Sequence, residues 1–91
     1  MKKVKGLQKY LGLMFKKEDT EPLMFEFDEE VDVPIHSWFV FFPFMAYWYD
    51  SEGILLQSRK INPFRSNIRC CCKFKTLIEI PWKRNVNIAK E

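Results

Sequence analysis

A dense run of aromatic residues between positions 38 and 49 constrains the fold of this chain more than any other feature. Eight of these twelve residues are aromatic, and none of the twelve is charged. A transmembrane helix needs about 18 or more consecutive apolar residues. This run is shorter, and Pro43 interrupts it. The segment therefore predicts the core of a small β protein rather than a membrane span.

The aromatic content of the whole chain also limits how many rings can remain in water. The 91 residues include nine Phe, three Tyr and three Trp. In a domain of this size, burial of apolar surface only narrowly exceeds the loss of chain entropy. Each aromatic side chain buries about 150–250 Å², so most of them must lie in a core or an interface. We expect one domain over residues 1–91, with a short tail at 82–91.

The N-terminal residues combine lysines with apolar side chains, as a secretory signal peptide does. However, Lys5, Gln8 and Lys9 interrupt the apolar part, and no small-residue cleavage site follows. We therefore expect this segment to be retained and the protein to be cytoplasmic. Apolar residues at helical spacing predict a short amphipathic helix over residues 5–15.

Alternating residues and turn signals predict several short strands after this helix. Residues 23–28 alternate between two faces, with Leu23, Phe25 and Phe27 on one and Met24, Glu26 and Asp28 on the other. Both faces of 35–48 are apolar. Turns are expected at 50–53 and 62–65, with a return strand between them. Residues 68–80 have a period of two, with charged residues, including Glu79, at odd positions. The expected class is mostly β, a compact β-sandwich or barrel-like domain with one short N-terminal helix.

The charge of the chain is divided into blocks. Residues 1–17 carry six lysines and no acid, residues 18–32 carry eight acids and no base, and 59–84 are basic again. We expect these blocks to pair within the molecule, although each exposed ion pair contributes only about 0–1 kcal/mol. The alternative is weak nucleic-acid binding through the basic 59–84 region. Its candidate phosphate contacts are Arg59, Lys60, Arg65, Arg69, Lys73 and Lys75.

Several segments, in order along the chain, resemble one protein family. They are "GLMF" at 12–15, "PLMFEF" at 22–27, "IHSWFVFFPFMAYWYDSEG" at 35–53, "INPFR" at 61–65 and "KTLIEIP" at 75–81. Together they are similar to the prokaryotic domain of unknown function 192 family, also called uncharacterised protein family 0127. The long aromatic segment keeps the family pattern at His36, Trp38, Phe39, Phe42, Pro43, Asp50 and Gly53. The resemblance covers residues 12–81 and implies a compact, mostly β fold with no established activity.

Two departures from the family pattern point to a binding surface. Phe41 stands where the family usually has arginine, and Met45 stands where it usually has aspartate. Our first hypothesis is therefore a non-enzymatic interaction or small-ligand-binding module. Its contact residues would be Trp38, Phe41, Met45 and Trp48, and its partner would be another protein or a second copy of the chain.

The alternative hypothesis is an enzyme, and few residues could supply its chemistry. It would use His36, the single histidine, with Asp50 or Cys71 from another strand. Cys70, Cys71 and Cys72 lack the spacing of a zinc site. On a strand, neighbouring cysteines point to opposite faces, which disfavours a disulfide. We expect Cys71 to be the reactive thiol, and we expect neither a metal nor another cofactor.

Overall fold

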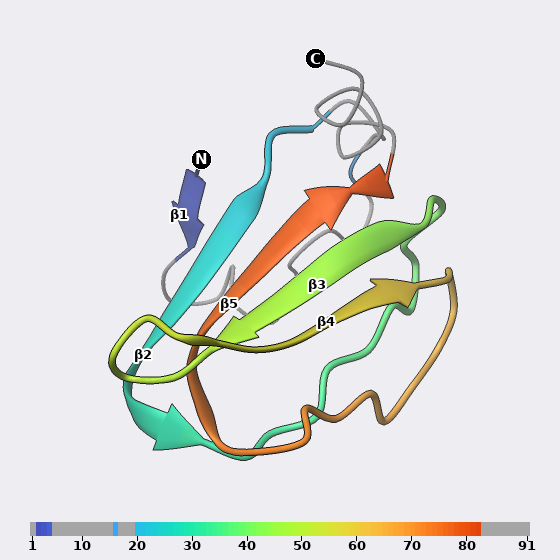
Figure 1. Cartoon of the computed structure of the whole chain (residues 1–91). Helices are drawn as coiled ribbons and strands as arrows, with labels where there is room; N and C mark the ends of the chain where they lie inside the picture. Colours follow the sequence, from blue (N-terminus) through green and yellow to red (C-terminus); the bar gives the residue numbers. More distant parts are fainter. Residues whose placement is uncertain (1, 5–15, 17–19, 83–91) are drawn as a thin grey trace.

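The computed structural model describes residues 2–4, 16 and 20–82, and its strands form a single five-stranded sheet (Figure 1). The strands are β1 (Lys2–Val4), β2 (Leu23–Val31), β3 (Phe44–Tyr49), β4 (Leu55–Ile61) and β5 (Phe74–Pro81). Their order is β1-β2-β5-β3-β4, with β1 parallel to β2 and the other neighbours antiparallel. The predicted mostly β class is confirmed. The helix expected over residues 5–15 and the tail residues 83–91 lie outside the described residues.

The alternation predicted for the first long strand and the turn predicted after the aromatic run are both present. In β2, Leu23 and Phe25 are buried on the same face of the sheet. β3 and β4 form an antiparallel hairpin. In its turn, the N–H of Gly53 donates to the carbonyl of Asp50 at 3.1 Å, and the N–H of Asp50 donates to the carbonyl of Ile54 at 3.0 Å. Gly53 has a φ of 80°, which glycine adopts without a steric cost.

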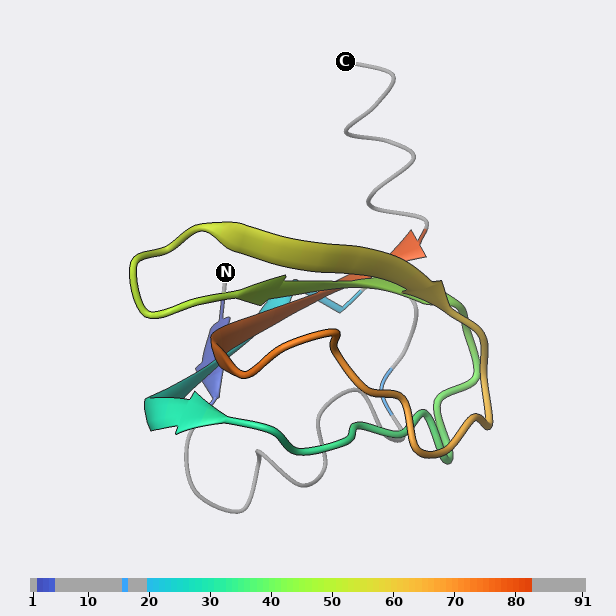
Figure 2. The same ribbon diagram turned by 60° about the horizontal axis from the view of Figure 1, so that its bottom comes forward.

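A second layer, made of the irregular segments 32–43 and 62–73, lies against one face of the sheet (Figure 2). An isolated bridge joins the two segments: the N–H of Ile35 donates to the carbonyl of Ile68 at 2.8 Å, and Ile68 returns a bond of 2.9 Å. Within the described part of the chain, no helix has the length and hydropathy needed to cross a membrane.

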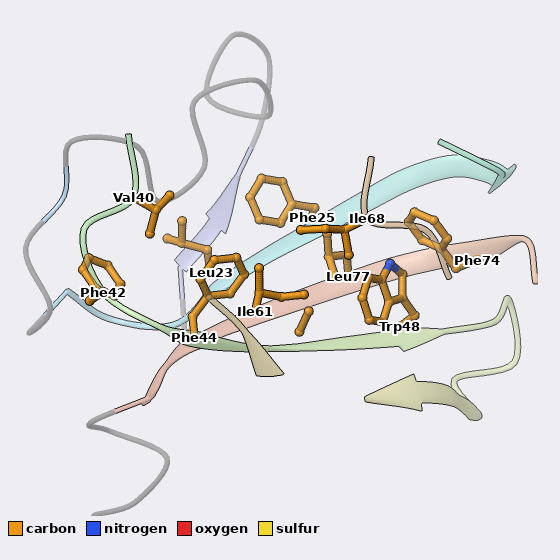
Figure 3. Close-up of a cluster of buried hydrophobic side chains, with 11 residues drawn as sticks. Leu23, Phe25, Val40, Phe42, Phe44, Trp48, Ile61, Ile68, Phe74 and Leu77 are labelled. Atoms are coloured by element: carbon orange, nitrogen blue, oxygen red, sulfur yellow. The ribbon is translucent and has the colours of Figure 1, made fainter. Parts of the chain in front are cut away.

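The hydrophobic core fills the space between this layer and the sheet (Figure 3). Its residues come from β2, β3, β4, β5 and both irregular segments, so the core joins parts of the chain that are far apart in sequence. They are Leu23, Phe25, Val40, Phe42, Phe44, Ala46, Trp48, Ile61, Ile68, Phe74 and Leu77.

The burial pattern of β5 contradicts the phase predicted from the sequence. Phe74 is buried at an even position, but the next buried residues, Leu77 and Glu79, are at odd positions. The register between β5 and β2 shifts at this point of β5. Between the paired positions Glu26–Thr76 and Val31–Phe74, β2 contains more residues than β5 does. The period of two had placed Glu79 with the charged residues. In the structure, Glu79 lies on the core face, where it pairs with Leu23 of β2 on one side and Ala46 of β3 on the other.

Candidate functional site, an exposed aromatic cluster

Ser37 joins two turns of the second layer that are distant in sequence. Its hydroxyl donates a hydrogen bond of 2.6 Å to the carbonyl of Asn62 and accepts one of 2.7 Å from the N–H of Arg65. Its backbone N–H also donates to the carbonyl of Arg65, and its carbonyl accepts the N–H of Phe64, both at 2.8 Å. The residue is fully buried. Buried hydrogen bonds of this kind fix the turn at 37–40 against the turn at 62–65.

Each of these turns contains an aromatic residue in the left-handed backbone conformation. The φ angle is 58° at both Phe39 and Phe64. This conformation costs a residue with a Cβ atom about 1–2 kcal/mol relative to the right-handed one. Strained backbone persists only where surrounding contacts hold it, and it is concentrated at functional sites. In this chain, the bonds of Ser37 hold both turns.

Four aromatic side chains lie in these turns or directly after the first one, and we call Trp38, Phe39, Phe41 and Phe64 the aromatic cluster. Phe64 lies at its centre, with ring centroids 6.2 Å from Trp38, 6.0 Å from Phe39 and 5.4 Å from Phe41, all in edge-to-face geometry. The exposed fractions are 45%, 45%, 63% and 41% in sequence order. The cluster is therefore an ordered apolar surface open to solvent, which is typical of interaction sites.

The charged side chains next to the cluster in sequence are positive. Residues 33–49 contain no acid, and Arg65 is the only charged residue in 61–68. Arg65 is exposed. Further along the second layer, an Arg69 guanidinium nitrogen lies 3.6 Å from a carboxylate oxygen of Asp32. The cluster thus combines exposed apolar rings with an exposed arginine that follows Phe64 in sequence.

The four contact residues predicted from the sequence occupy three different environments. Trp38 and Phe41 belong to the aromatic cluster. Met45 is half-buried on the face of β3 opposite the core. Trp48 is fully buried, because it shares the core face of β3 with Phe44 (Figure 3). Trp48 therefore belongs to the core and is not available as a surface contact.

Phe39 and Phe64 belong to the cluster but were not among the predicted contact residues. Phe64 follows the Asn62-Pro63 turn signal, and a large apolar residue in a turn is a recognisable sign of exposure. The left-handed conformation of Phe39 has no comparable local signal, since left-handed turns usually contain Gly, Asn or Asp. The central position of Phe64 also depends on contacts with a segment more than twenty residues away.

The two polar groups suggested for catalysis bind backbone groups instead. His36 is exposed, and its Nδ1 accepts the N–H of Trp38 at 3.3 Å. The Asp50 carboxylate accepts the N–H groups of Glu52 and Ile54, both at 2.9 Å. Asp50 thus stabilises the β3–β4 turn. These contacts organise local backbone and supply no nucleophile to His36.

The three cysteines lie before β5 rather than within a strand, which corrects the expected geometry. Cys70 is half-buried and packs against the core, whereas Cys71 and Cys72 are exposed in a bend. Because the bend replaces strand alternation, the Sγ atoms of Cys71 and Cys72 do not point to opposite faces but lie 3.3 Å apart. Among the residues that the structure describes, no group of three or more His, Cys, Asp or Glu side chains could hold a metal ion.

In the described part of the 59–84 region, residues 59–82, the basic residues do not all lie on one face. Arg59 and Lys60 are neighbours on β4, so their side chains leave opposite faces of the sheet. The Lys60 ammonium lies 4.3 Å from the centroid of the Trp82 ring. Arg69 is paired with Asp32. Arg59, Lys60 and Arg69 therefore do not line one continuous strip for a phosphate backbone.

Glu79 is a buried acid that the sequence placed on the charged face. Burial raises the pKa of this carboxyl from 4.5 to about 8, because the apolar surroundings disfavour its charged form. Its neighbours across the sheet, Leu23 and Ala46, are both buried and apolar. At neutral pH the side chain is therefore mainly protonated and lies inside the core.

Comparisons with family models, with curated proteins and with solved structures found no match to this chain. The resemblance to the domain of unknown function 192 family therefore stays a prediction.

Proposed function

We propose that this chain is a non-enzymatic binding module that inserts its aromatic cluster into an apolar pocket of a protein partner. The supporting observation is that all four rings stay exposed, although the same fold buries Phe44, Trp48 and Phe74 completely or almost completely. Exposed apolar patches on small domains mark interaction sites. Aromatic residues and arginine are also enriched at the centres of protein interfaces.

The rigidity of the cluster supports the same proposal. Ser37 ties the two turns together, and three ring–ring contacts converge on Phe64. A surface that is ordered before binding loses less conformational entropy when the complex forms. The cluster therefore has the preorganisation expected of a binding surface.

The charges beside the cluster favour a partner that carries carboxylates around its pocket. Arg65 supplies the cation, and the neighbouring aromatic segment 33–49 contains no acid. Two copies of this chain meeting through their clusters would bring their Arg65 side chains together, and such like-charge contacts oppose association. A different protein is thus a better occupant than a second copy.

Site-specific photo-crosslinking tests this proposal in the cells that make the protein. The photoreactive residue p-benzoylphenylalanine replaces Phe41 in the full chain, and the crosslinked products are identified by mass spectrometry. The matched control carries the same residue at Ile54, an apolar side chain of similar exposure (57%) in the β3–β4 turn. We expect one predominant protein partner from position 41 and not from position 54.

Two further variants test the proposal with the purified partner. Phe64→Ser removes the central ring, and Arg65→Glu reverses the adjacent charge, so both should weaken binding to the purified partner. Equal crosslinking from positions 41 and 54 would contradict the proposal. Crosslinks joining two copies of the chain, with concentration-dependent sedimentation that Phe41→Ser abolishes, would assign the surface to a homodimer instead.

A further inference from the structure

The bend before β5 brings two exposed thiols into direct contact. The Cys72 thiol donates to the Sγ atom of Cys71 across 3.3 Å. Both residues are exposed, whereas Cys70 is half-buried against the core. A ligand arriving from solvent therefore meets Cys71 and Cys72 as a pair.

The bend is anchored to the neighbouring strand β4. The backbone N–H of Cys71 donates a hydrogen bond of 2.7 Å to the Gln57 side-chain oxygen, and the Cys71 thiol lies 3.9 Å from the carbonyl oxygen of Leu56. These contacts hold the backbone of Cys71 while its sulfur remains exposed. The position of the thiol pair is thus set by the fold and not only by adjacency in sequence.

The raised pKa of Cys72 argues against a strongly activated nucleophile at this position. Its hydrogen bond to the Cys71 side chain, followed by repulsion from the charge of a Cys71 thiolate, raises the pKa of Cys72. Burial raises the pKa of Cys70. Catalytic cysteines require a lowered pKa. The Cys72 thiol is therefore better suited to a ligand whose binding displaces the thiol proton.

The spacing of the residues disfavours a disulfide as the stable state of this pair. Adjacent Cα atoms are about 3.8 Å apart, whereas disulfides usually join Cα atoms about 4.4–6.8 Å apart. Closing the bond between neighbours therefore strains it and makes it easily reduced. The dithiol is the form that remains available for a ligand.

The coordination demands of soft ions narrow the ligand class. Zn²⁺ is normally bound by four ligands, and its Zn–S distance of about 2.3 Å in tetrahedral geometry separates two sulfurs by about 3.8 Å. Linear two-coordinate Cu(I) places its sulfurs on opposite sides of the ion. A trivalent pyramidal centre has bond angles close to a right angle, so it holds two bound sulfurs close together. Its third bond can go to an oxygen or a carbon atom, so two sulfurs suffice. The observed separation of 3.3 Å fits the last geometry best.

We propose that Cys71 and Cys72 form a dithiol site that captures a trivalent arsenical through two As–S bonds. With arsenous acid, two As–O bonds break and two As–S bonds form. Each hydroxyl leaves with one thiol proton as water, so two water molecules are released. Arsenic stays trivalent and both sulfurs keep their oxidation state, so no oxidant or reductant is needed.

Phenylarsine oxide is the probe that tests the site on the reduced full chain. Its arsenic forms one bond to each sulfur and its oxygen leaves with both protons as one water. Intact mass spectrometry should show one adduct per chain. Cys70→Ser is the matched control, because it removes the third thiol of the same run and should keep the adduct.

The single variants Cys71→Ser and Cys72→Ser should each lose chelation. We expect their apparent affinity to fall by about 100-fold or more, since the second bond of a chelate forms at a high effective concentration. Both side chains are exposed, so near-ultraviolet circular dichroism should show an unchanged fold. An unchanged affinity in either single variant would overturn the proposal. Tight Zn²⁺ binding that Cys72→Ser abolishes would replace the arsenical with a different ligand.

Discussion

The aromatic cluster and the aromatic residues of the core show one type of side chain in two different environments of a small domain. Phe44 and Trp48 are buried because β3 sends alternate side chains toward the second layer. Just before β3, Phe39 has a left-handed backbone, and the rings of the turn face solvent. The aromatic run is continuous in sequence, so backbone conformation and not composition decides which rings pack in the core and which are exposed to solvent.

The largest test of this comparison is a pair of alanine variants. Phe44→Ala should lower the free energy of unfolding by about 3–5 kcal/mol, because it leaves a cavity in the core. Phe41→Ala should lower it by less than about 1 kcal/mol, because that ring is mostly exposed. Urea unfolding followed by far-ultraviolet circular dichroism measures both values. Equal losses would mean that the cluster is part of the stabilising core.

The second test concerns the carboxyl group in the core. The pKa of Glu79 is about 8 in the fold and 4.5 without burial, so the folded chain keeps a proton that the unfolded chain loses between these values. Stability should therefore fall as pH rises through this window, by roughly 3 kcal/mol between pH 4.5 and pH 7, and level off above pH 8.

Glu79→Gln removes this titration and so serves as the comparison. The difference in unfolding free energy between the two proteins should grow in favour of the variant as pH rises from 4.5 to 8. Urea unfolding over a series of pH values measures it. A difference that does not change with pH would show that Glu79 ionises normally in the fold.

The third test measures how much the hydroxyl of Ser37 stabilises the two turns that carry the cluster. Ser37→Ala removes the hydroxyl that bonds Asn62 and Arg65, and should cost about 1–3 kcal/mol because buried backbone groups lose their partner. Ser66→Ala, at an exposed position in the same segment, should cost less than about 0.5 kcal/mol. Chemical unfolding followed by tryptophan emission reports both effects. If both variants were equally stable, Ser37 would not be the residue that joins the turns.

The smallest expected effect isolates the backbone strain in the cluster. Phe39→Gly and Phe39→Ala both remove the ring, but only glycine adopts a φ near 58° without a steric cost. The glycine variant should therefore be more stable than the alanine variant by about 1 kcal/mol, as measured by thermal unfolding. The reverse order would argue against a left-handed conformation at this position.

The parts of the fold that depend on local sequence were predicted well. The alternation of Leu23 and Phe25 and the turn ending at Gly53 are encoded by neighbouring residues, and the structure contains both. The burial of Glu79 was not predictable in the same way. It depends on a register shift against β2, a strand some fifty residues earlier in the chain.

The candidate site was predicted only in part, for a related reason. Phe41, an apolar residue where the family that the chain resembles usually has arginine, pointed to a surface, and that side chain is the most exposed of the cluster. Trp48 was included because both faces of the aromatic run are apolar, and periodicity alone does not show which face packs inward. The contact between Cys71 and Cys72 was missed because the period of two continued through residues that the structure places in a bend.

The hydroxyl of Ser37 forms hydrogen bonds with Asn62 and Arg65, which lie 25 and 28 positions further along the chain. The surface that it organises therefore does not exist in any short stretch of the chain. Synthetic peptides covering either turn alone should lack the surface, and an antibody raised against it should recognise only folded protein. Loss of partner binding in a mutant can therefore report unfolding as readily as a lost contact, and each such measurement needs a stability measurement beside it.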